Sequence, residues 1–317
     1  MTDRSEVLVL STVVQVFVEI VLPIFAMVGV GYALARTRGI PPGPISTITL
    51  YLFAPALTFS ALTRTTLAVA DALGIVLFSV LFTAVMYVLS VAIARSIRMD
   101  RPTESAFLLT TLFMNAGNFG LSLTLLAFGE EGLQRAVVFF VCQATMGNSL
   151  GVFLASRSNA GVLDSLKATA RMPLVYAAFA AVAVTLLGLP VPSLIAKPAE
   201  ILGNAAIPSM LVVLGAQLAA NPKIGEDLHL VAGVSGVRLL LAAVVALGLT
   251  WVMGIGGLTQ QVLILQASMP TAVFTIIIAT EFGANPRFVT SVVVVSTLVS
   301  LLTVTLLLSL LLGMTPP

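Results

Sequence analysis

Apolar residues run along this chain in long segments that are separated only by short polar stretches. Ten of these segments approach the roughly 20 residues that a helix needs to cross the hydrocarbon core of a membrane. Only helices or closed barrels satisfy their backbone groups in lipid, and the alternating pattern of barrel strands is absent. The pattern therefore predicts an all-α membrane protein with ten transmembrane helices, at residues 12–35, 43–62, 69–94, 103–128, 133–156, 172–188, 194–219, 228–254, 259–282 and 287–312.

Two of the expected spans are interrupted by residues that do not favour a continuous helix. The fourth span contains the sequence NAGNFG at 115–120, and the ninth contains SMPT at 268–271. Both spans end with the dipeptide Phe-Gly, at 128–129 and at 282–283, which lie 154 residues apart. Interrupted spans at matching positions in two halves are typical of the binding site of a secondary transporter.

The separation of 154 residues indicates that the chain consists of two similar halves of five spans each. They are residues 1–156 and 172–317, joined by a central loop at 157–171. Pro55 in span 2 and Pro208 in span 7 match at nearly the same distance. Because each half has an odd number of spans, the halves should lie in the membrane with opposite orientation. We therefore expect two inverted five-helix repeats whose broken helices, spans 4 and 9, cross.

Basic residues predict how the protein is oriented. Cytoplasmic loops of membrane proteins carry an excess of Lys and Arg. The loops after the odd-numbered spans hold ten such residues, and the loops on the opposite side hold four. The first side should therefore be cytoplasmic, and both termini should lie on the outer side of the inner membrane. The ten are Arg36, Arg38, Arg95, Arg98, Arg101, Arg157, Lys167, Arg171, Lys223 and Arg287, and the four are Arg4, Arg64, Arg135 and Lys197.

Composition excludes several other classes of protein. Hydrophobic residues make up 59% of the chain and charged residues only 9%, whereas a soluble domain carries roughly 25%. A net charge of +2 gives no indication of nucleic-acid binding. Cys142 is the only cysteine, which excludes an intrachain disulfide, and His229 is the only histidine and lies by a predicted loop. Without a catalytic cluster or a metal motif, we expect neither an enzyme nor a bound cofactor.

The chemistry of a broken membrane helix predicts its ligand. The break frees carbonyls at the end of one half-helix and N–H groups at the start of the next, and lipid can satisfy neither. We expect the second half-helices to start near Phe119 and Pro270, with their positive ends meeting at the midplane, where an anion such as a carboxylate would bind. Asn115 and Asn118 add amide groups, and Gly117 permits close backbone approach. The alternative is that these asparagines only bond a neighbouring helix.

Further polar residues within spans complete the candidate set. The expected substrate-binding residues are Asn115, Gly117, Asn118, Met269, Pro270, Thr271 and Asn148. Gln266, Ser268 and Glu19 are candidates for ion coupling, because carboxylates and oxygen ligands inside a membrane are often functional; Glu19 could instead simply contact Gln15. Arg238, inside span 8, could attract the anion or pair with a carboxylate such as Glu19.

At these residues the chain resembles the auxin efflux carrier family. The motifs are NAGNFGLSL at 115–123, AFG at 127–129, LGNAAIPSMLVVLGAQLA at 202–219, QASMPTA at 266–272 and EFG at 281–283. The family favours proline where this chain has Ser122. The resemblance implies a fold shared with bile-acid/sodium symporters, with a transport domain around two crossed broken helices. It also implies a scaffold of spans 1, 2, 6 and 7, through which two copies would form a homodimer. The long central loop of plant members is missing, which argues against auxin as the substrate.

Pattern and resemblance together predict a carrier that moves a small organic anion across the cytoplasmic membrane by alternating access. A sodium-coupled symporter of the bile-acid type is the alternative. A proton/sodium antiporter is disfavoured because no Asp lies in the middle of a span. The helix N-termini at the crossing favour an anion without any accompanying ion. We therefore expect binding that does not require sodium, with Glu19 as the foremost carrier of any coupled proton.

Overall fold

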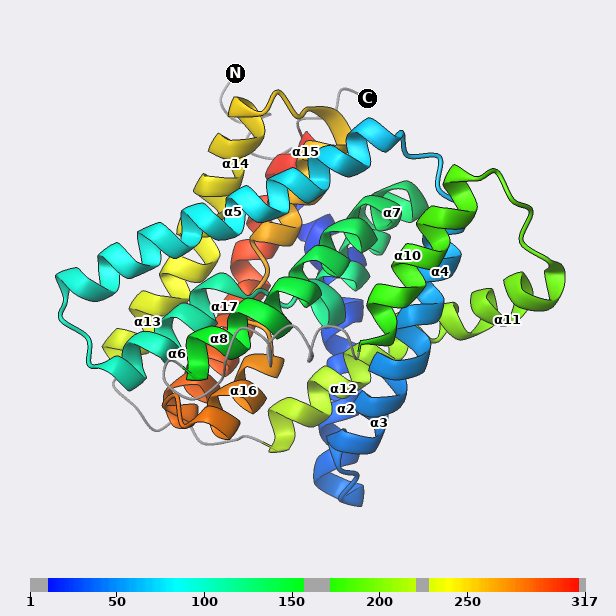
Figure 1. Ribbon diagram of the computed structural model, residues 1–317. Coiled ribbons are helices and arrows are strands. Elements are labelled where there is room, and N and C mark those ends of the chain that lie inside the picture. Colours follow the sequence, from blue (N-terminus) through cyan, green and yellow to red (C-terminus); the bar gives the residue numbers. More distant parts are fainter. Residues whose placement is uncertain (1–10, 157–171, 221–227, 314–317) are drawn as a thin grey trace.

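The computed structural model describes residues 11–156, 172–220 and 228–313, and these residues fold into helices joined by short connections (Figure 1). The predicted central loop at 157–171 and both chain ends lie outside the described residues. Seven helices within the described ranges are long and apolar enough to cross a membrane, which confirms an all-helical, multi-pass protein. They are Ser11–Arg38, Pro42–Thr63, Val69–Ser96, Ala116–Ala155, Ser193–Ala220, Leu228–Val252 and Pro286–Gly313.

The remaining predicted spans are present as shorter pieces. Span 6 corresponds to a helix of 14 residues, which is about 21 Å long at 1.5 Å per residue. Spans 4 and 9 are each divided where the sequence predicts a break. Spans 4 and 5 run into one another, and Gly129, with φ 63° and ψ −161°, marks the boundary between them. The count of ten crossings and the inverted repeat remain predictions.

Several of the long helices contain one wide turn, so each is named in segments. In chain order the segments are η1 (Phe17–Val21), α2 (Leu22–Arg38), α3 (Pro42–Ile48), η2 (Thr49–Phe53), α4 (Ala54–Thr63), α5 (Val69–Ser96), α6 (Arg101–Leu112), η3 (Ala116–Leu121), α7 (Ser122–Met146), η4 (Gly147–Gly151), α8 (Val152–Ser156), α10 (Pro173–Leu186), α11 (Ser193–Asn204), α12 (Ala206–Ala220), α13 (Leu228–Gly236), η5 (Val237–Leu241), α14 (Ala242–Val252), α15 (Gly257–Ala267), α16 (Phe274–Phe282) and α17 (Pro286–Gly313).

Local sequence explains where many of these helices begin and end. Pro42, Pro173 and Pro286 occupy the first helical position, where a missing N–H has no cost. Gly39 and Gly283 follow the last residues of α2 and α16 with φ of 64° and 69°, the left-handed conformation that ends a helix. These are the turn signals that separate the spans in the sequence.

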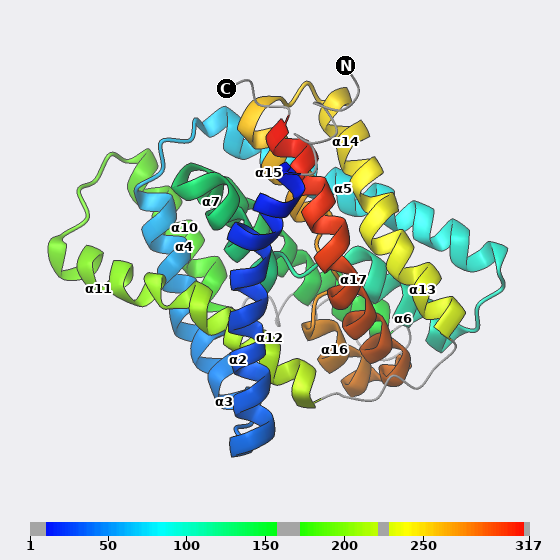
Figure 2. The same ribbon diagram turned by 180° about the vertical axis from the view of Figure 1, so that it is seen from behind.

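The helices pack in two groups (Figures 1 and 2). In one group α2 packs along α12, and α4 packs against α10 and α11. In the other, α5, α13, α14 and α17 pack around α6, α15 and α16, which belong to the two broken spans, while α7 contacts both groups. The spans that the resemblance assigns to a scaffold therefore pack against one another. The start of η1 and the end of α17 lie at one end of the molecule, and the end of α2 lies at the other (Figure 2).

The contact between α2 and α12 depends on two glycines. A Cβ added at Gly31 would lie 2.1 Å from the carbonyl oxygen of Val212, and one added at Gly215 would lie 1.9 Å from that of Val28. Neither distance is possible, so the helix backbones are closer than any other residue would allow. Membrane helices lack a hydrophobic force between them and depend on such close packing.

We expect Gly31→Ala to lower the stability of the protein because the added methyl group must force α2 away from α12. Overpacking of this kind typically costs about 1–3 kcal/mol. Gly29→Ala is the matched control, since it lies on the same helix and a Cβ there meets no atom within 4 Å. The midpoint of thermal unfolding in detergent measures both. Equal midpoints for the two variants would contradict the close approach.

Candidate functional site

The two breaks predicted from the sequence meet in space and pair with each other. The N–H of Asn115 donates to the carbonyl of Pro270 at 2.7 Å, and the N–H of Ala272 donates to the carbonyl of Phe113 at 3.0 Å. Met114 and Thr271 form the antiparallel bridge between these bonds. Four half-helices, α6, η3, α15 and α16, therefore start or end at one crossing. This arrangement is the one in which irregular backbone is tolerated at membrane depth, because protein covers it.

Side chains satisfy further backbone groups at the crossing. The hydroxyl of Thr271 donates to the carbonyl of Thr110 at 2.8 Å, near the end of α6, and the N–H of Thr271 donates to Ser296 Oγ at 3.2 Å. Thr271 is fully buried. Its side chain thus fixes one break to the other instead of facing open space.

The second half-helices start at different residues from those expected. η3 begins at Ala116, three residues before Phe119, and α16 begins at Phe274, four residues after Pro270. The reason is the pairing of the breaks. Residues 270–272 are extended alongside Phe113, so the helical turn forms only after Ala272, whose carbonyl accepts from the N–H of Thr275 at 3.2 Å. The sequence located both breaks but not the helix starts.

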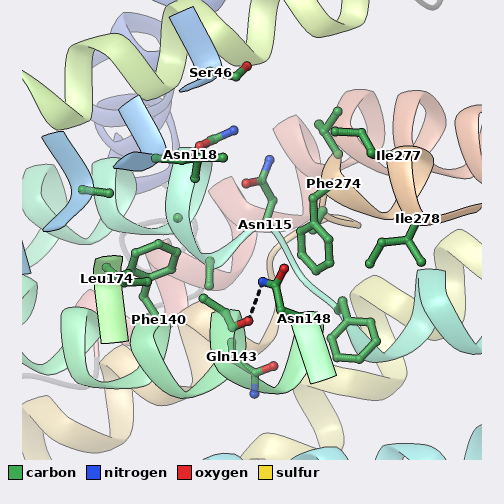
Figure 3. Close-up of a pocket in the computed structure, with 18 of the residues that line it drawn as sticks. Ser46, Asn115, Asn118, Phe140, Gln143, Asn148, Leu174, Phe274, Ile277 and Ile278 are labelled. Atoms are coloured by element: carbon green, nitrogen blue, oxygen red, sulfur yellow. Dashed lines mark hydrogen bonds between the residues drawn. The ribbon is translucent and has the colours of Figure 1, made fainter. Parts of the chain in front are cut away.

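A cavity of about 590 Å³ opens beside the crossing (Figure 3). η3, α7, η4 and α16 form most of its wall, and α3, η2 and α12 contribute from the other helix group. Most of the wall is apolar, with the rings of Phe140 and Phe274 and the side chains of Ile277 and Ile278 around it (Figure 3). The polar residues of the wall are Ser46, Thr49, Asn115, Asn118, Gln143, Asn148, Gln217 and Glu281.

Asn115 holds an unsatisfied donor at this cavity. Its side chain is only 4% exposed, and its Nδ2 has no hydrogen-bond partner. Buried polar groups are almost always paired, so an unpaired amide on a cavity wall is an available ligand contact. Asn118 lies within η3, which begins directly after Asn115, and is on the side of the cavity near Ser46 (Figure 3). Asn148, from the opposite wall, already donates from Nδ2 to the carbonyl of Ala144 at 2.8 Å.

The start of η3 adds positive potential without a charged side chain. The first N–H groups of a helix have no partner within the helix, and they carry part of the positive end of its dipole. Here the N–H of Ala116 bends back to Met114 O at 2.8 Å. Gly117 and Asn118, which follow, line the cavity. A Cβ at Gly117 would lie 2.7 Å from Cε2 of the Phe140 ring, so any larger residue would require that ring to shift.

Among the lining residues that the structure describes, none is basic and Glu281 alone is acidic. The described residues also hold no group of three or more His, Cys, Asp or Glu side chains that could bind a metal ion. The wall therefore offers amide and backbone donors to a ligand, together with apolar surface for its carbon atoms.

Several expected binding residues lie at the crossing but do not line the cavity. Met269, Pro270 and Thr271 are buried behind its wall. Ser268 donates from Oγ to the carbonyl of Ile264 at 2.7 Å. Gln266 is fully buried and donates from Nε2 to Thr124 Oγ1 at 3.1 Å. Substrate binding by the first three residues and ion coupling by Ser268 and Gln266 remain predictions. None of the five lines the cavity, and Oε1 of Gln266 is buried without a partner.

Glu19 and Arg238 also lie away from the cavity. Glu19 is exposed on η1 and accepts a bond from Gln15 at 3.1 Å, the contact that the sequence offered as its alternative role. The pairing of Arg238 with Glu19, one of the two roles that the sequence offered for it, is not formed. Arg238 is fully buried and donates instead to the carbonyls of Thr111, at 2.7 Å, and Ala267.

Five polar lining residues were not among the predicted site residues: Ser46, Thr49, Gln143, Gln217 and Glu281. Thr49 Oγ1 and Gln143 Oε1 are buried without a partner, while Gln143 Nε2 donates to Thr83 Oγ1 at 3.3 Å. Gln143 and Gln217 each place an amide inside an expected membrane span, which is costly and is the signal that could have identified them. Ser46 and Thr49 carry no such signal in the sequence, because most hydroxyls within helices bond their own backbone, although Thr49 Oγ1 does not do so here.

Comparison with known proteins shows the family of this chain. The model of a family described as "Membrane transport protein" matches residues 16–308. An "Uncharacterized transporter" of Methanothermobacter thermautotrophicus is 28% identical over 296 residues, covering 91% of this chain and 96% of that protein. A protein of Rhizobium meliloti named "Putative malonate transporter" is 28% identical over 303 residues, 90% of this chain and 93% of its own.

A plant protein is similar over a shorter stretch. Auxin efflux carrier component 1 of Arabidopsis thaliana is 30% identical over 124 residues, which is 39% of this chain and 20% of the plant protein. The family match, by contrast, covers nearly all of the described helices and both breaks. The chain therefore belongs to the membrane transport protein family, the family of the auxin efflux carriers, and is an integral membrane transporter.

Proposed function

We propose that this protein is a secondary carrier that moves a small organic anion, a carboxylate, across the cytoplasmic membrane. The observation that carries the proposal is the unpaired Nδ2 of Asn115 at the start of η3, on the wall of the cavity. A donor at the positive end of a helix suits a carboxylate oxygen. Anions at helix N-termini are stabilised there by about 0.3–1 kcal/mol, and by up to about 2 kcal/mol where the site is partly buried.

The wall supports a ligand with one polar end and a short carbon skeleton. The carboxylate would accept from Asn115 Nδ2 and from N–H groups of the first turn of η3, at Gly117 and Asn118. Its carbon atoms would lie against Phe140, Phe274 and neighbouring apolar side chains. The volume of about 590 Å³ is within the usual range of small-molecule sites. The name of the Rhizobium relative, with malonate in it, supports short carboxylic acids as the class to test first.

Alternating access would move the crossing relative to the helices packed around α2, α4 and α12. The cavity supports this proposal because its wall combines both helix groups, so relative motion of the groups would open or close it. In this proposal the two halves are inverted repeats, spans 1, 2, 6 and 7 are the scaffold, and two copies pair through it. The basic residues at the end of α2 would face the cytoplasm.

Uptake into proteoliposomes tests the proposed substrate class. The purified protein is reconstituted, and uptake of radiolabelled malonate is measured against competing acetate, propionate, succinate and the uncharged diamide of malonic acid. We expect at least one carboxylate to be taken up saturably and the diamide not to compete, because a neutral amide gains little from the helix start. Uptake should be equal in sodium and in choline at constant pH. Competition by the diamide as strong as that of malonate would contradict an anion site.

A further inference from the structure

One arginine lies within the span of a membrane helix and connects both halves of the crossing. Arg238 occupies the second position of η5, a single wide turn between α13 and α14, ten residues after Leu228. It is fully buried. Burial of a charged group costs several kcal/mol unless hydrogen bonds and opposite charge offset it. The partners of Arg238 must therefore account for its position.

Those partners are the ends of two half-helices. Nη1 donates to the carbonyl of Thr111, in the last turn of α6, at 2.7 Å, and Nη2 donates to the carbonyl of Ala267, the last residue of α15. A helix C-terminus carries roughly half a negative elementary charge. Two such ends facing one guanidinium therefore come close to balancing its charge, without any carboxylate.

Most of the other carbonyls freed at these ends already accept a hydrogen bond. In α6, Leu109 accepts from the N–H of Phe113 at 3.3 Å, and Thr110 accepts from Thr271 Oγ1 at 2.8 Å. In α15, the carbonyls of residues 264–266 accept from the N–H groups of residues 268 and 269. The oxygens left for an outside donor include those of Thr111 and Ala267, and Arg238 takes both. Carbonyl oxygens of this kind are also the ligands that a hard cation such as sodium prefers.

From this geometry we infer that Arg238 is the permanent counter-cation of the crossing, a guanidinium tethered by the chain in a position that a dissolved monovalent cation would otherwise have to fill. Arg238 does not line the cavity, so it is not a ligand of the transported molecule. It is a positioning residue. By holding the ends of α6 and α15 together, it fixes the start of η3, and with it Asn115, three residues beyond the end of α6.

The inference makes a direct statement about ions. In the wild-type protein the crossing should need no sodium, because its negative ends are already neutralised. Removal of the side chain should leave two unsatisfied carbonyls around a vacated space and create a dependence on added cation that the wild type lacks. This consequence can be measured without any substrate, so its outcome is independent of the proposed carrier activity.

Thermal unfolding in detergent provides the test. Wild type, Arg238→Ala and Arg135→Ala are compared in choline chloride, sodium chloride and methylguanidinium chloride at equal ionic strength. Arg135 is the control because it also bridges two helices, donating to Thr259 Oγ1 at 3.0 Å and to Glu131 O at 2.7 Å, but is only partly buried. We expect a midpoint about 10 °C lower for Arg238→Ala in choline. Methylguanidinium or sodium should restore part of it saturably, with no such effect on the other two proteins.

Two results would overturn the inference. One is a wild-type protein that sodium stabilises saturably over choline. The other is an Arg238→Ala variant whose midpoint responds to none of the cations. If the alanine variant does not fold, Arg238→Lys and Arg238→Gln replace it, since both are long but only lysine is charged. The inference requires the lysine variant to be the more stable of the two, and the opposite order refutes it.

Discussion

Replacing Asn115 by aspartate is expected to abolish binding of a carboxylate substrate, and replacing it by alanine to weaken binding about 10- to 100-fold. The alanine variant loses one hydrogen bond to a charged group, which contributes about 1.5–3 kcal/mol. The aspartate variant places a negative charge on a residue of the cavity wall and removes the unpaired Nδ2. Repulsion between the new side-chain carboxylate and the carboxylate of the substrate then weakens binding further than loss of the hydrogen bond alone. Binding of labelled substrate to purified protein measures both effects.

Stability separates this prediction from a structural role of Asn115. Its Nδ2 has no partner within the protein, so the alanine variant loses no bond from that atom and should unfold at nearly the wild-type temperature. Asn204→Asp is the matched control, since Asn204 ends α11 at an exposed position and does not line the cavity. Loss of stability in Asn115→Ala in proportion to the loss of binding would identify the side chain as a helix contact only.

Replacing Ala144 by tryptophan is expected to abolish uptake by filling the cavity. Ala144 lines it from α7, one turn before Asn148, and is only half-buried. A bulky ring at this position must extend into the space that the substrate would occupy, close to Asn148 and Phe274. The protein should still fold because the ring enters an existing space instead of a packed core. Uptake and binding in the same preparation measure the effect.

Val244→Trp on α14 is the control for the tryptophan variant. Val244 is 66% exposed on the outer face of the helix groups, and its substitution adds the same bulk away from the cavity. We expect wild-type uptake from this control. Uptake with unchanged affinity in Ala144→Trp would show that the substrate passes elsewhere, and the cavity would then lose its proposed role.

The sequence predicts the places where the helices break because breaking residues act locally. Proline and glycine within apolar runs disfavour a regular helix wherever the chain goes, so Asn115 to Gly120 and Ser268 to Thr271 could be identified without a structure. The left-handed Gly39 and Gly283 are local signals of the same kind. The positions at which helices resume are not local. They depend on the pairing of Ala272 with Phe113, which lies 159 residues away.

The candidate site was predicted in part for the same reason. Asn115, Gly117, Asn118 and Asn148 line the cavity, and each lies in a polar motif that stands out within an apolar span. Thr49 and Gln217 come from the other helix group, and only packing brings them to the same wall. The partners of Arg238 were beyond prediction, because backbone carbonyls are present at every residue and no sequence pattern marks the two that a guanidinium will reach.

The bridge between the breaks has a consequence for how this protein can change over evolutionary time. Its two hydrogen bonds, from Asn115 to Pro270 and from Ala272 to Phe113, join main-chain atoms only. Any substitution other than proline at 115 or 272 leaves the donors in place. The crossing is therefore insulated from the identity of the side chains around the cavity. Substitutions in the cavity wall can therefore change the transported substrate, while the backbone bridge at the crossing is retained.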